Sequence, residues 1–155
     1  MPDIEIRDLP AMTVVGVPHS GPYHRIAPAF EALGRILGEA DAHGATRGWL
    51  GLYHDSPETT PEAELRSHAA AVWAADAPPP EGLETIEVPG GRYAVLTYRG
   101  PYEGLADAWR SFTPEAIASA GGASLREAAA MEIYVDDPQS VPPEQVRTEL
   151  CLAVL

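Results

Sequence analysis

One glutamate of this 155-residue chain lies in a segment that is otherwise apolar. Glu132 occupies the stretch AAAMEIYV, whose apolar and aromatic residues predict a β-strand. Side chains alternate along a strand, so Glu132 and Tyr134 share one face while Met131 and Ile133 share the other. We expect the apolar face to pack on a helix. Glu132 and Tyr134 should then face a cleft.

A carboxylate in such a place is costly unless something compensates for its charge. It can bind a cationic ligand, or act as a general base that activates a water molecule. It can also be a structural ion-pair partner. The candidate partners are Arg66, Arg92 and Arg147.

Aromatic side chains are the second group with chemical potential, because Tyr and Trp offer flat faces to rings and cations. We expect Tyr53 and Tyr134 to line the cleft, followed by Tyr98. Trp109 and Tyr102 are further candidates for ligand contact. Each also has a structural interpretation, since Trp109 lies on an apolar helix stripe and Tyr102 opens a helix, where it could lock the turn.

The elements that position these residues occur twice. The segment DLPAMTVVGVPHSGPY (residues 8–23) aligns without gaps on EVPGGRYAVLTYRGPY (87–102), at an offset of 79 residues. Further along, LYHDSPETTPEAELRS (52–67) aligns on IYVDDPQSVPPEQVRT (133–148), at an offset of 81. The chain therefore reads as two repeats, residues 4–73 and 83–154, joined by a proline-rich linker at 76–82 within one domain spanning 1–155.

Each repeat predicts a strand, a helix and two more strands. The first strands cover 13–17 and 93–98, and apolar residues at helical spacing follow, with a helix break at Thr113. Later strands are expected at 49–54, 66–73, 131–135 and 147–154. One helix per repeat predicts an α+β fold, a pseudo-twofold duplication with antiparallel sheets and a central ligand cleft.

The composition excludes several function classes. The net charge is −13, and all ten formal cations are arginines. Without lysine the chain cannot form a Schiff base or a P-loop phosphate site. An acidic chain without a basic face is not expected to bind nucleic acid directly, and it attracts cations instead.

No apolar run is long enough to cross a bilayer, so no membrane association is expected. The single cysteine, Cys151, fits a reducing cytoplasm. The five histidines do not form a metal-ligand pattern, and neither a metal nor another cofactor is expected.

Taken together, the two Gly-Pro-Tyr turns, the duplicated elements and the segments EIYVDDP and PPEQVRTEL resemble the GyrI-like small-molecule-binding domains, along essentially the whole chain. This family also forms effector-binding domains of AraC-type and multidrug-responsive regulators. The resemblance implies a cleft between the two halves for drug-like molecules, and a buried acidic residue at the position of Glu132. The aligned residue of the first repeat is Gly51, so a single acidic group is expected.

The expected function is binding of small hydrophobic, aromatic or cationic molecules by a stand-alone protective or sensing protein. Two alternatives implied by the resemblance stay open. One is a hydrolase that opens strained rings of cyclopropane-bearing genotoxins, with Glu132 as general base. The other is a protein-interaction module acting on DNA gyrase. An open sheet edge would also permit a homodimer.

Overall fold

The computed structural model describes residues 3–155, which form two compact units. The first unit combines the residues up to Pro10 with Gly90–Leu155, and the second is Ala11–Pro89. The chain passes from one unit to the other at Pro10 and at Pro89, which are equivalent positions of the two aligned repeats. The units therefore do not begin where the sequence repeats begin.

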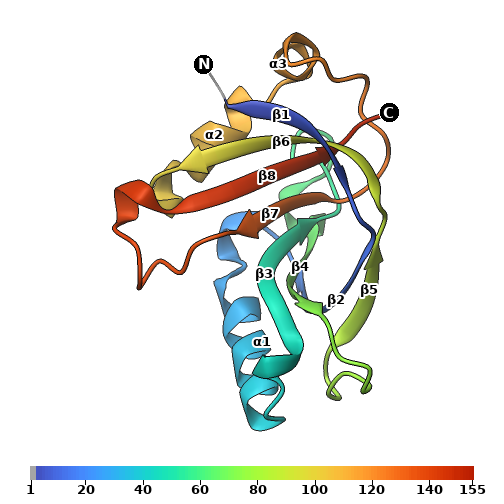
Figure 1. Ribbon diagram of the computed structural model, residues 1–155, viewed down its shortest axis with the longest axis vertical. Coiled ribbons are helices and arrows are strands. Elements are labelled where there is room, and N and C mark those ends of the chain that lie inside the picture. Colours follow the sequence, from blue (N-terminus) through green and yellow to red (C-terminus); the bar gives the residue numbers. More distant parts are fainter. Residues whose placement is uncertain (1–2) are drawn as a thin grey trace. The chain divides into compact units, whose positions relative to one another are not determined.

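The first unit is an antiparallel sheet of four strands in the order β1-β6-β8-β7, which lie side by side in Figure 1. Its strands are β1 (Ile4–Leu9), β6 (Gly91–Arg99), β7 (Ala130–Tyr134) and β8 (Arg147–Ala153). Its helices are α2 (Leu105–Ser111), α3 (Pro114–Ser119) and the short 3-10 turns η4 (Tyr102–Gly104) and η5 (Pro143–Gln145).

The second unit is an antiparallel sheet in the order β5-β2-β4-β3. Its strands are β2 (Met12–Ser20), β3 (Thr46–Tyr53), β4 (Arg66–Trp73) and β5 (Glu84–Val88). Its helices are α1 (Ala27–Glu39) and the 3-10 turns η1 (Tyr23–Arg25), η2 (His43–Ala45) and η3 (Glu62–Glu64). The predicted α+β class with antiparallel sheets is confirmed.

The leading strands exchange places between the repeats. β1 precedes β2 in the sequence, yet it pairs with β6, and β5 precedes β6, yet it pairs with β2. Each sheet thus takes its outer strand from the other repeat. Local sequence patterns predict that these segments are strands but do not predict their partners, because pairing depends on where the chain turns at Pro10 and Pro89.

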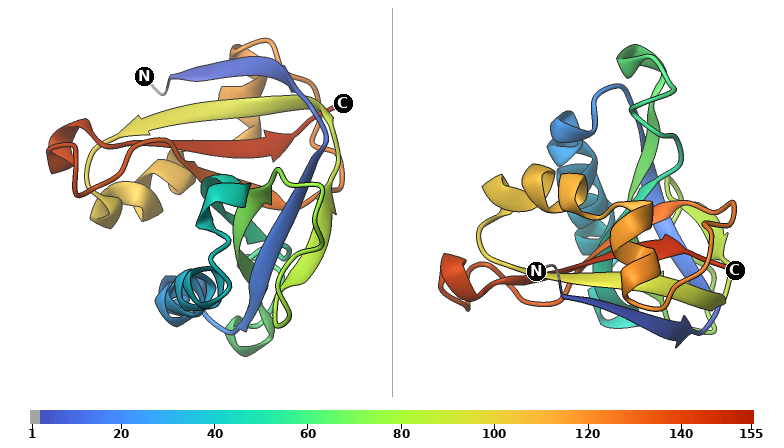
Figure 2. Two further views of the ribbon diagram at one scale, coloured as in Figure 1. Left: turned by 60° about the horizontal axis from the view of Figure 1, so that its bottom comes forward. Right: turned by 90° about the horizontal axis from the view of Figure 1, so that it is seen from above.

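Each sheet is covered by helix on one face. In the second unit the apolar stripe of α1, including Leu33 and Leu37, packs on Ala69 and Ala71 of β4. In the first unit α2 and α3 contribute Ala108, Phe112 and Ile117 to a core with β6 and β8, and Figure 2 shows both helices on one side of these strands. The predicted break at Thr113 is confirmed, since its hydroxyl accepts the Ala116 N–H at 3.1 Å and caps α3.

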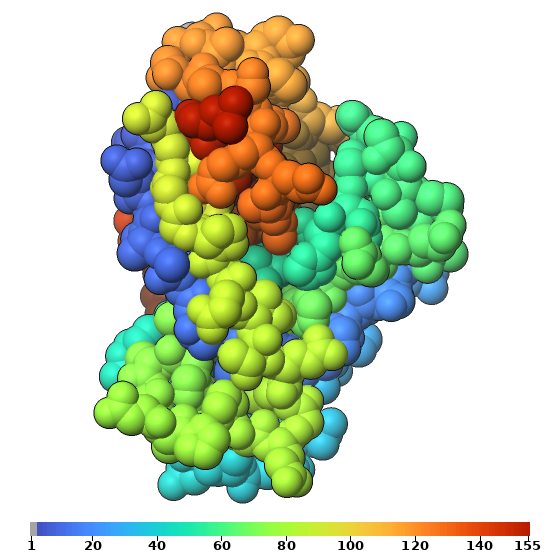
Figure 3. Space-filling model, turned by 90° about the vertical axis from the view of Figure 1, so that its right-hand side faces the viewer, coloured from blue at the N-terminus to red at the C-terminus, as the bar shows by residue number. Residues whose placement is uncertain are grey.

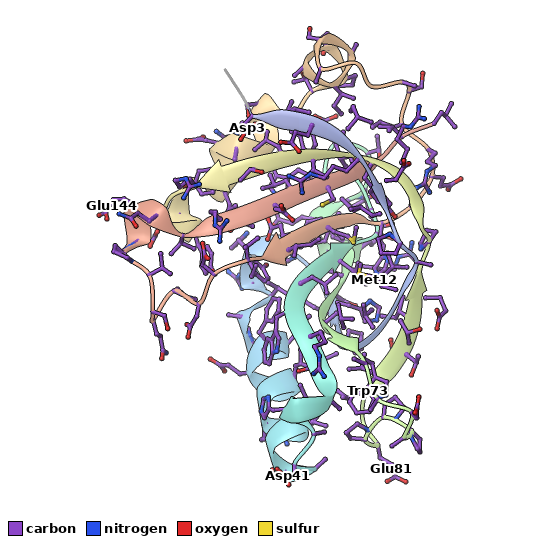
Figure 4. All side chains as sticks on the ribbon, in the orientation of Figure 1. Asp3, Met12, Asp41, Trp73, Glu81 and Glu144 are labelled. Atoms are coloured by element: carbon purple, nitrogen blue, oxygen red, sulfur yellow. The ribbon has the colours of Figure 1, made fainter. Side chains whose placement is uncertain are left out.

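The proline-rich segment between the repeats is mostly exposed and lies on the surface of the space-filling view (Figure 3, yellow-green). Trp73, at the end of β4, donates its indole N–H to the Ala77 carbonyl at 3.0 Å and so holds the beginning of this segment in place. Figure 4 labels Trp73 and, further along, Glu81 in this part of the second unit. Within residues 3–155, no helix has the length and apolar character that a membrane crossing requires.

Candidate functional site

Glu132 lies in the middle of β7, directly opposite Leu150 of β8, and only 7% of it is exposed. Leu150 belongs to the core beneath α2 and α3, so Glu132 points to the helix-covered face of its sheet. Met131 pairs with Cys151 and points to the opposite face. The predicted alternation is confirmed, but the side was wrong: the acidic residue, and not Met131, faces the helices.

Both oxygens of the Glu132 carboxylate accept hydrogen bonds from aromatic side chains of the same unit. The Trp109 indole N–H, from α2, donates to Oε2 at 2.6 Å. The Tyr134 hydroxyl, two residues along β7, donates to Oε1 at 2.8 Å. Charge-assisted bonds of this kind are short and about twice as strong as neutral ones. They fix the carboxylate in one position, with indole and phenol rings around it.

A third ring extends this group toward solvent. The Tyr102 ring, at the start of η4, lies 5.7 Å from the Tyr134 ring at a tilt of 59°, and 38% of Tyr102 is exposed. Burial, followed by the charges of Asp137, Glu132 and Asp136, raises the pKa of Tyr102. Glu132, Trp109, Tyr134 and Tyr102 therefore form one cluster, which we call the Glu132 site.

Tyr98 has a different place. Its hydroxyl donates to the Pro101 carbonyl at 2.7 Å and packs against Gly104, so it locks the turn before η4. It also lines a surface depression of about 490 Å³ together with Asp107 and Ser111 of α2. Tyr98 thus stabilises the turn that carries Tyr102, and its hydroxyl already donates a hydrogen bond to the Pro101 carbonyl.

Thr148 is a residue that the sequence reasoning missed. It lies on β8 between Tyr134 and Tyr98, paired with each across the strands, and is fully buried. Its hydroxyl makes no hydrogen bond to any of residues 3–155. A buried hydroxyl without a partner costs about 1–3 kcal/mol. The sequence signal was its position two residues before Leu150, on the same face as Glu132.

Two of the three arginines proposed as structural partners of Glu132 bind other carboxylates. Arg147 forms a bidentate pair with Asp136, with Nε–Oδ2 and Nη2–Oδ1 distances of 3.0 and 2.9 Å. Arg66 forms the same pair with Asp55 at 3.0 and 2.9 Å. Hydrogen bonding by Arg147 lowers the pKa of Asp136 to about 2. These two clamps close the loops that follow Tyr134 and Tyr53.

In the second unit, the positions equivalent to the Glu132 site include no acidic residue. Gly51 stands where Glu132 stands in the first unit, and the Tyr53 ring lies over it, with its hydroxyl 2.7 Å from the point that a Cβ of residue 51 would occupy. Phe30 corresponds to Trp109 and stacks on Trp49 at 6.1 Å. The Tyr53 ring contacts the Tyr23 ring at 4.8 Å. Tyr53 is therefore part of an aromatic cluster of its own unit.

A chain of polar side chains crosses the other face of that sheet. His54 Nε2 lies 2.8 Å from His68 Nδ1, and His68 Nε2 lies 2.6 Å from Glu84 Oε1. The carboxylate only accepts, so His68 carries its proton on Nε2 and, when neutral, accepts the Nε2 proton of His54 at Nδ1. Burial, then the charge of His68, lowers the pKa of His54. Among residues 3–155, no three His, Cys, Asp or Glu side chains are placed to hold a metal ion.

The chain is similar in sequence and in structure to known proteins. A DNA gyrase inhibitor of Yersinia enterocolitica is 33% identical over 129 residues, covering 80% of each chain. The C-terminal domain of EcmrR has a similar structure, with a TM-score of 0.77 at 15% identity, covering all of this chain and 98% of that one. In the EcmrR–DNA complex, this chain spans 57% of the longer EcmrR chain.

A structure of SAV2435 bound to tetraphenylphosphonium is also similar, with a TM-score of 0.71 at 17% identity, covering 99% of this chain and 94% of that one. The family model described as the GyrI-like small molecule binding domain matches residues 2–155. Together with the antiparallel α+β fold, these matches show that the chain belongs to the GyrI-like small-molecule-binding domain family.

Proposed function

We propose that the Glu132 site binds small organic cations with aromatic or other hydrophobic groups. The observation that carries this proposal is a carboxylate that is 7% exposed and surrounded by the rings of Trp109, Tyr134 and Tyr102. A ligand cation would gain from the charge of the carboxylate and from the negative faces of the rings. Its apolar groups would gain from contact with the same rings.

The way in which the carboxylate is held favours binding over catalysis. A general base has to take a proton from a water molecule within hydrogen-bond reach. Each oxygen of Glu132 already accepts one strong hydrogen bond, from Trp109 or from Tyr134. A carboxylate that is held in this way while the site is empty is suited to the role of counter-charge.

The similar proteins support the same class of ligand. SAV2435 was solved with tetraphenylphosphonium, a bulky aromatic cation, in a fold that this chain shares. The net charge of −13 would also raise the local concentration of cations near the protein. We therefore choose tetraphenylphosphonium as the probe for this chain.

The test is binding of tetraphenylphosphonium and of a neutral aromatic analogue, triphenylphosphine oxide, to wild-type protein and to Glu132→Gln. Unit charges about 6 Å apart at an effective dielectric of 20 attract each other by about 3 kcal/mol. The substitution should thus weaken binding of the cation by roughly 100-fold and leave the neutral compound nearly unchanged. Equal losses for both compounds would show that Glu132 contributes shape and not charge.

A second assay, with an electrophilic strained-ring compound, separates binding from hydrolysis. A protein that only binds leaves this compound unaltered and shows full, reversible occupancy. If the protein instead converts an electrophilic strained-ring compound to a hydrated product, and Glu132→Gln abolishes that conversion while keeping affinity, the function is hydrolytic.

A further inference from the structure

The two Gly-Pro-Tyr tyrosines are equivalent in sequence but not in their bonding. The Tyr23 hydroxyl donates to the Asp55 carbonyl at 2.6 Å and accepts the Asp55 N–H at 3.0 Å. The Tyr102 hydroxyl makes no hydrogen bond to any residue that the structure describes. Tyr23 is thus docked, by which we mean hydrogen-bonded to the backbone of the loop after β3, and Tyr102 is not docked on the equivalent loop after β7.

The acceptor and donor that Tyr102 would need are nevertheless in place. Asp136 corresponds to Asp55 and carries the same bidentate clamp, to Arg147. The backbone ties around the two docks also match: Gly100 N–H donates to Val146 O at 2.8 Å, as Gly21 N–H does to Leu65 O at 2.8 Å. The dock on Asp136 is therefore built in the same way as the occupied dock on Asp55.

The residue next to the second tyrosine of each pair differs between the two units. In the second unit Tyr53 lies directly over Gly51, and its ring is 4.8 Å from the Tyr23 ring. In the first unit Glu132 takes the position of Gly51, and the Tyr134 hydroxyl donates to its carboxylate at 2.8 Å. The Tyr134 and Tyr102 rings lie 5.7 Å apart at almost the same tilt, 59° against 60°. The glutamate in place of Gly51 therefore accompanies a separation of the two rings that is wider by about 1 Å.

We propose that Tyr102 is the closing residue of the Glu132 site: it is undocked when the site is empty and binds the Asp136 backbone when a ligand is held. We expect the charge of a cation beside Glu132 to weaken the hydrogen bond that Oε1 accepts from the Tyr134 hydroxyl. Once that hydroxyl leaves Oε1, the carboxylate no longer holds the Tyr134 ring, and the neighbouring Tyr102 ring can move with it. Tyr102 then gains two hydrogen bonds to the backbone of Asp136. The inference rests on the proposed function for its ligand, but not for its undocked state.

Amide hydrogen exchange followed by NMR tests the ligand-free state directly. The Asp55 amide should be protected because it donates to Tyr23, and the Asp136 amide should exchange faster. Glu132→Gly, which reproduces the residue of the second unit, should protect the Asp136 amide without any ligand, with Glu132→Ala as a second variant if the first folds poorly. An Asp136 amide that stays unprotected in both variants would overturn the inference, whatever the ligand binds.

The ligand-bound state is tested with tetraphenylphosphonium. Saturation should protect the Asp136 amide in wild-type protein but not in Tyr102→Phe, which keeps the ring and lacks the hydroxyl. Tyr102→Phe should bind about 3- to 10-fold more weakly through faster dissociation, as expected for one or two lost hydrogen bonds. Its stability without ligand should equal that of wild type.

The matched control is Tyr23→Phe in the second unit. It removes a hydroxyl that is already bonded, so it should lower stability and leave ligand affinity unchanged. Equal dissociation rates for wild type and Tyr102→Phe would overturn the closing role while leaving cation binding intact. A wild-type protein that does not bind the cation at all would contradict the proposed function, and the Glu132→Gly exchange experiment would still decide whether Glu132 holds Tyr102 undocked.

Discussion

Glu132→Gln should change the free energy of unfolding by no more than about 2 kcal/mol, because the amide can replace the hydrogen bonds of the carboxylate with Trp109 and Tyr134. Its carbonyl oxygen accepts the Trp109 indole N–H, now 2.6 Å from Glu132 Oε2. Its NH₂ group donates to the Tyr134 hydroxyl, which can reverse from donor to acceptor.

The magnitude follows from two opposing effects. Hydrogen bonds to an ionised group contribute about 1.5–3 kcal/mol each and neutral ones about 0.5–1.5, so two bonds lose roughly 2–3 kcal/mol together. Burial of an ionised carboxylate costs several kcal/mol, which the neutral amide avoids. The two terms nearly cancel, and a change of 1 kcal/mol corresponds to about 2–4 °C in Tm for a chain of this size.

Urea and thermal denaturation at pH 7 measure this change. Glu132→Leu is the matched control, because it removes the acceptor of Trp109 and of Tyr134 without replacing it; it should be clearly less stable than Glu132→Gln. A loss of more than about 4 kcal/mol in Glu132→Gln would refute the reasoning, since it is the size expected when a buried ion pair loses one partner. Glu132 would then be a structural residue.

Three further predictions concern other residues. Thr148→Val should raise the free energy of unfolding by about 1 kcal/mol in urea denaturation, because it removes a buried hydroxyl that lacks a partner among residues 3–155; a loss would show that the hydroxyl is bonded in solution. The pKa of His54 is lowered below its usual 6.5 by burial, so the unfolded chain takes up this proton first as the pH falls. The contribution of His54 to stability should therefore be constant above about pH 6.5 and should fall as the pH drops from there toward the lowered pKa. His54→Gln should flatten that part of the stability–pH curve, and an unchanged slope would contradict the assignment. Burial raises the pKa of Cys151 to about 12, so a thiol reagent at pH 8 should label it only in denaturant, and rapid labelling of native protein would show that β8 opens.

Much of the site could be predicted from sequence because it depends on local patterns. Alternation along β7 placed Glu132 and Tyr134 together, and the second Gly-Pro-Tyr turn marked Tyr102. Trp109 was a candidate for ligand contact and also for the core; the structure places it on α2 as the donor to Glu132. The face of the sheet that meets the helix was predicted wrongly, because an apolar strand face indicates burial but not what covers it.

Other features could not be predicted because they depend on tertiary contacts. The exchange of β1 and β5 between the sheets follows from chain turns, which leave no periodic signal. The contact of His54 with His68 joins the residue after β3 to the middle of β4, and the spacing of 14 residues is not a known motif. The unbonded state of Thr148 is visible only once its neighbours are placed. The two-repeat organisation and the role of each site residue stay predictions.

The central claim is that the Glu132 carboxylate and its surrounding rings form a binding site for organic cations. The most direct measurement is a crystal structure of the complex with tetraphenylphosphonium. We predict that the phosphorus lies about 5–6 Å from the Glu132 carboxylate, at the separation used in the Coulomb estimate above, with phenyl groups against Trp109, Tyr134 and Tyr102. A cation bound elsewhere, with the Trp109 and Tyr134 hydrogen bonds to Glu132 unchanged, would contradict the account.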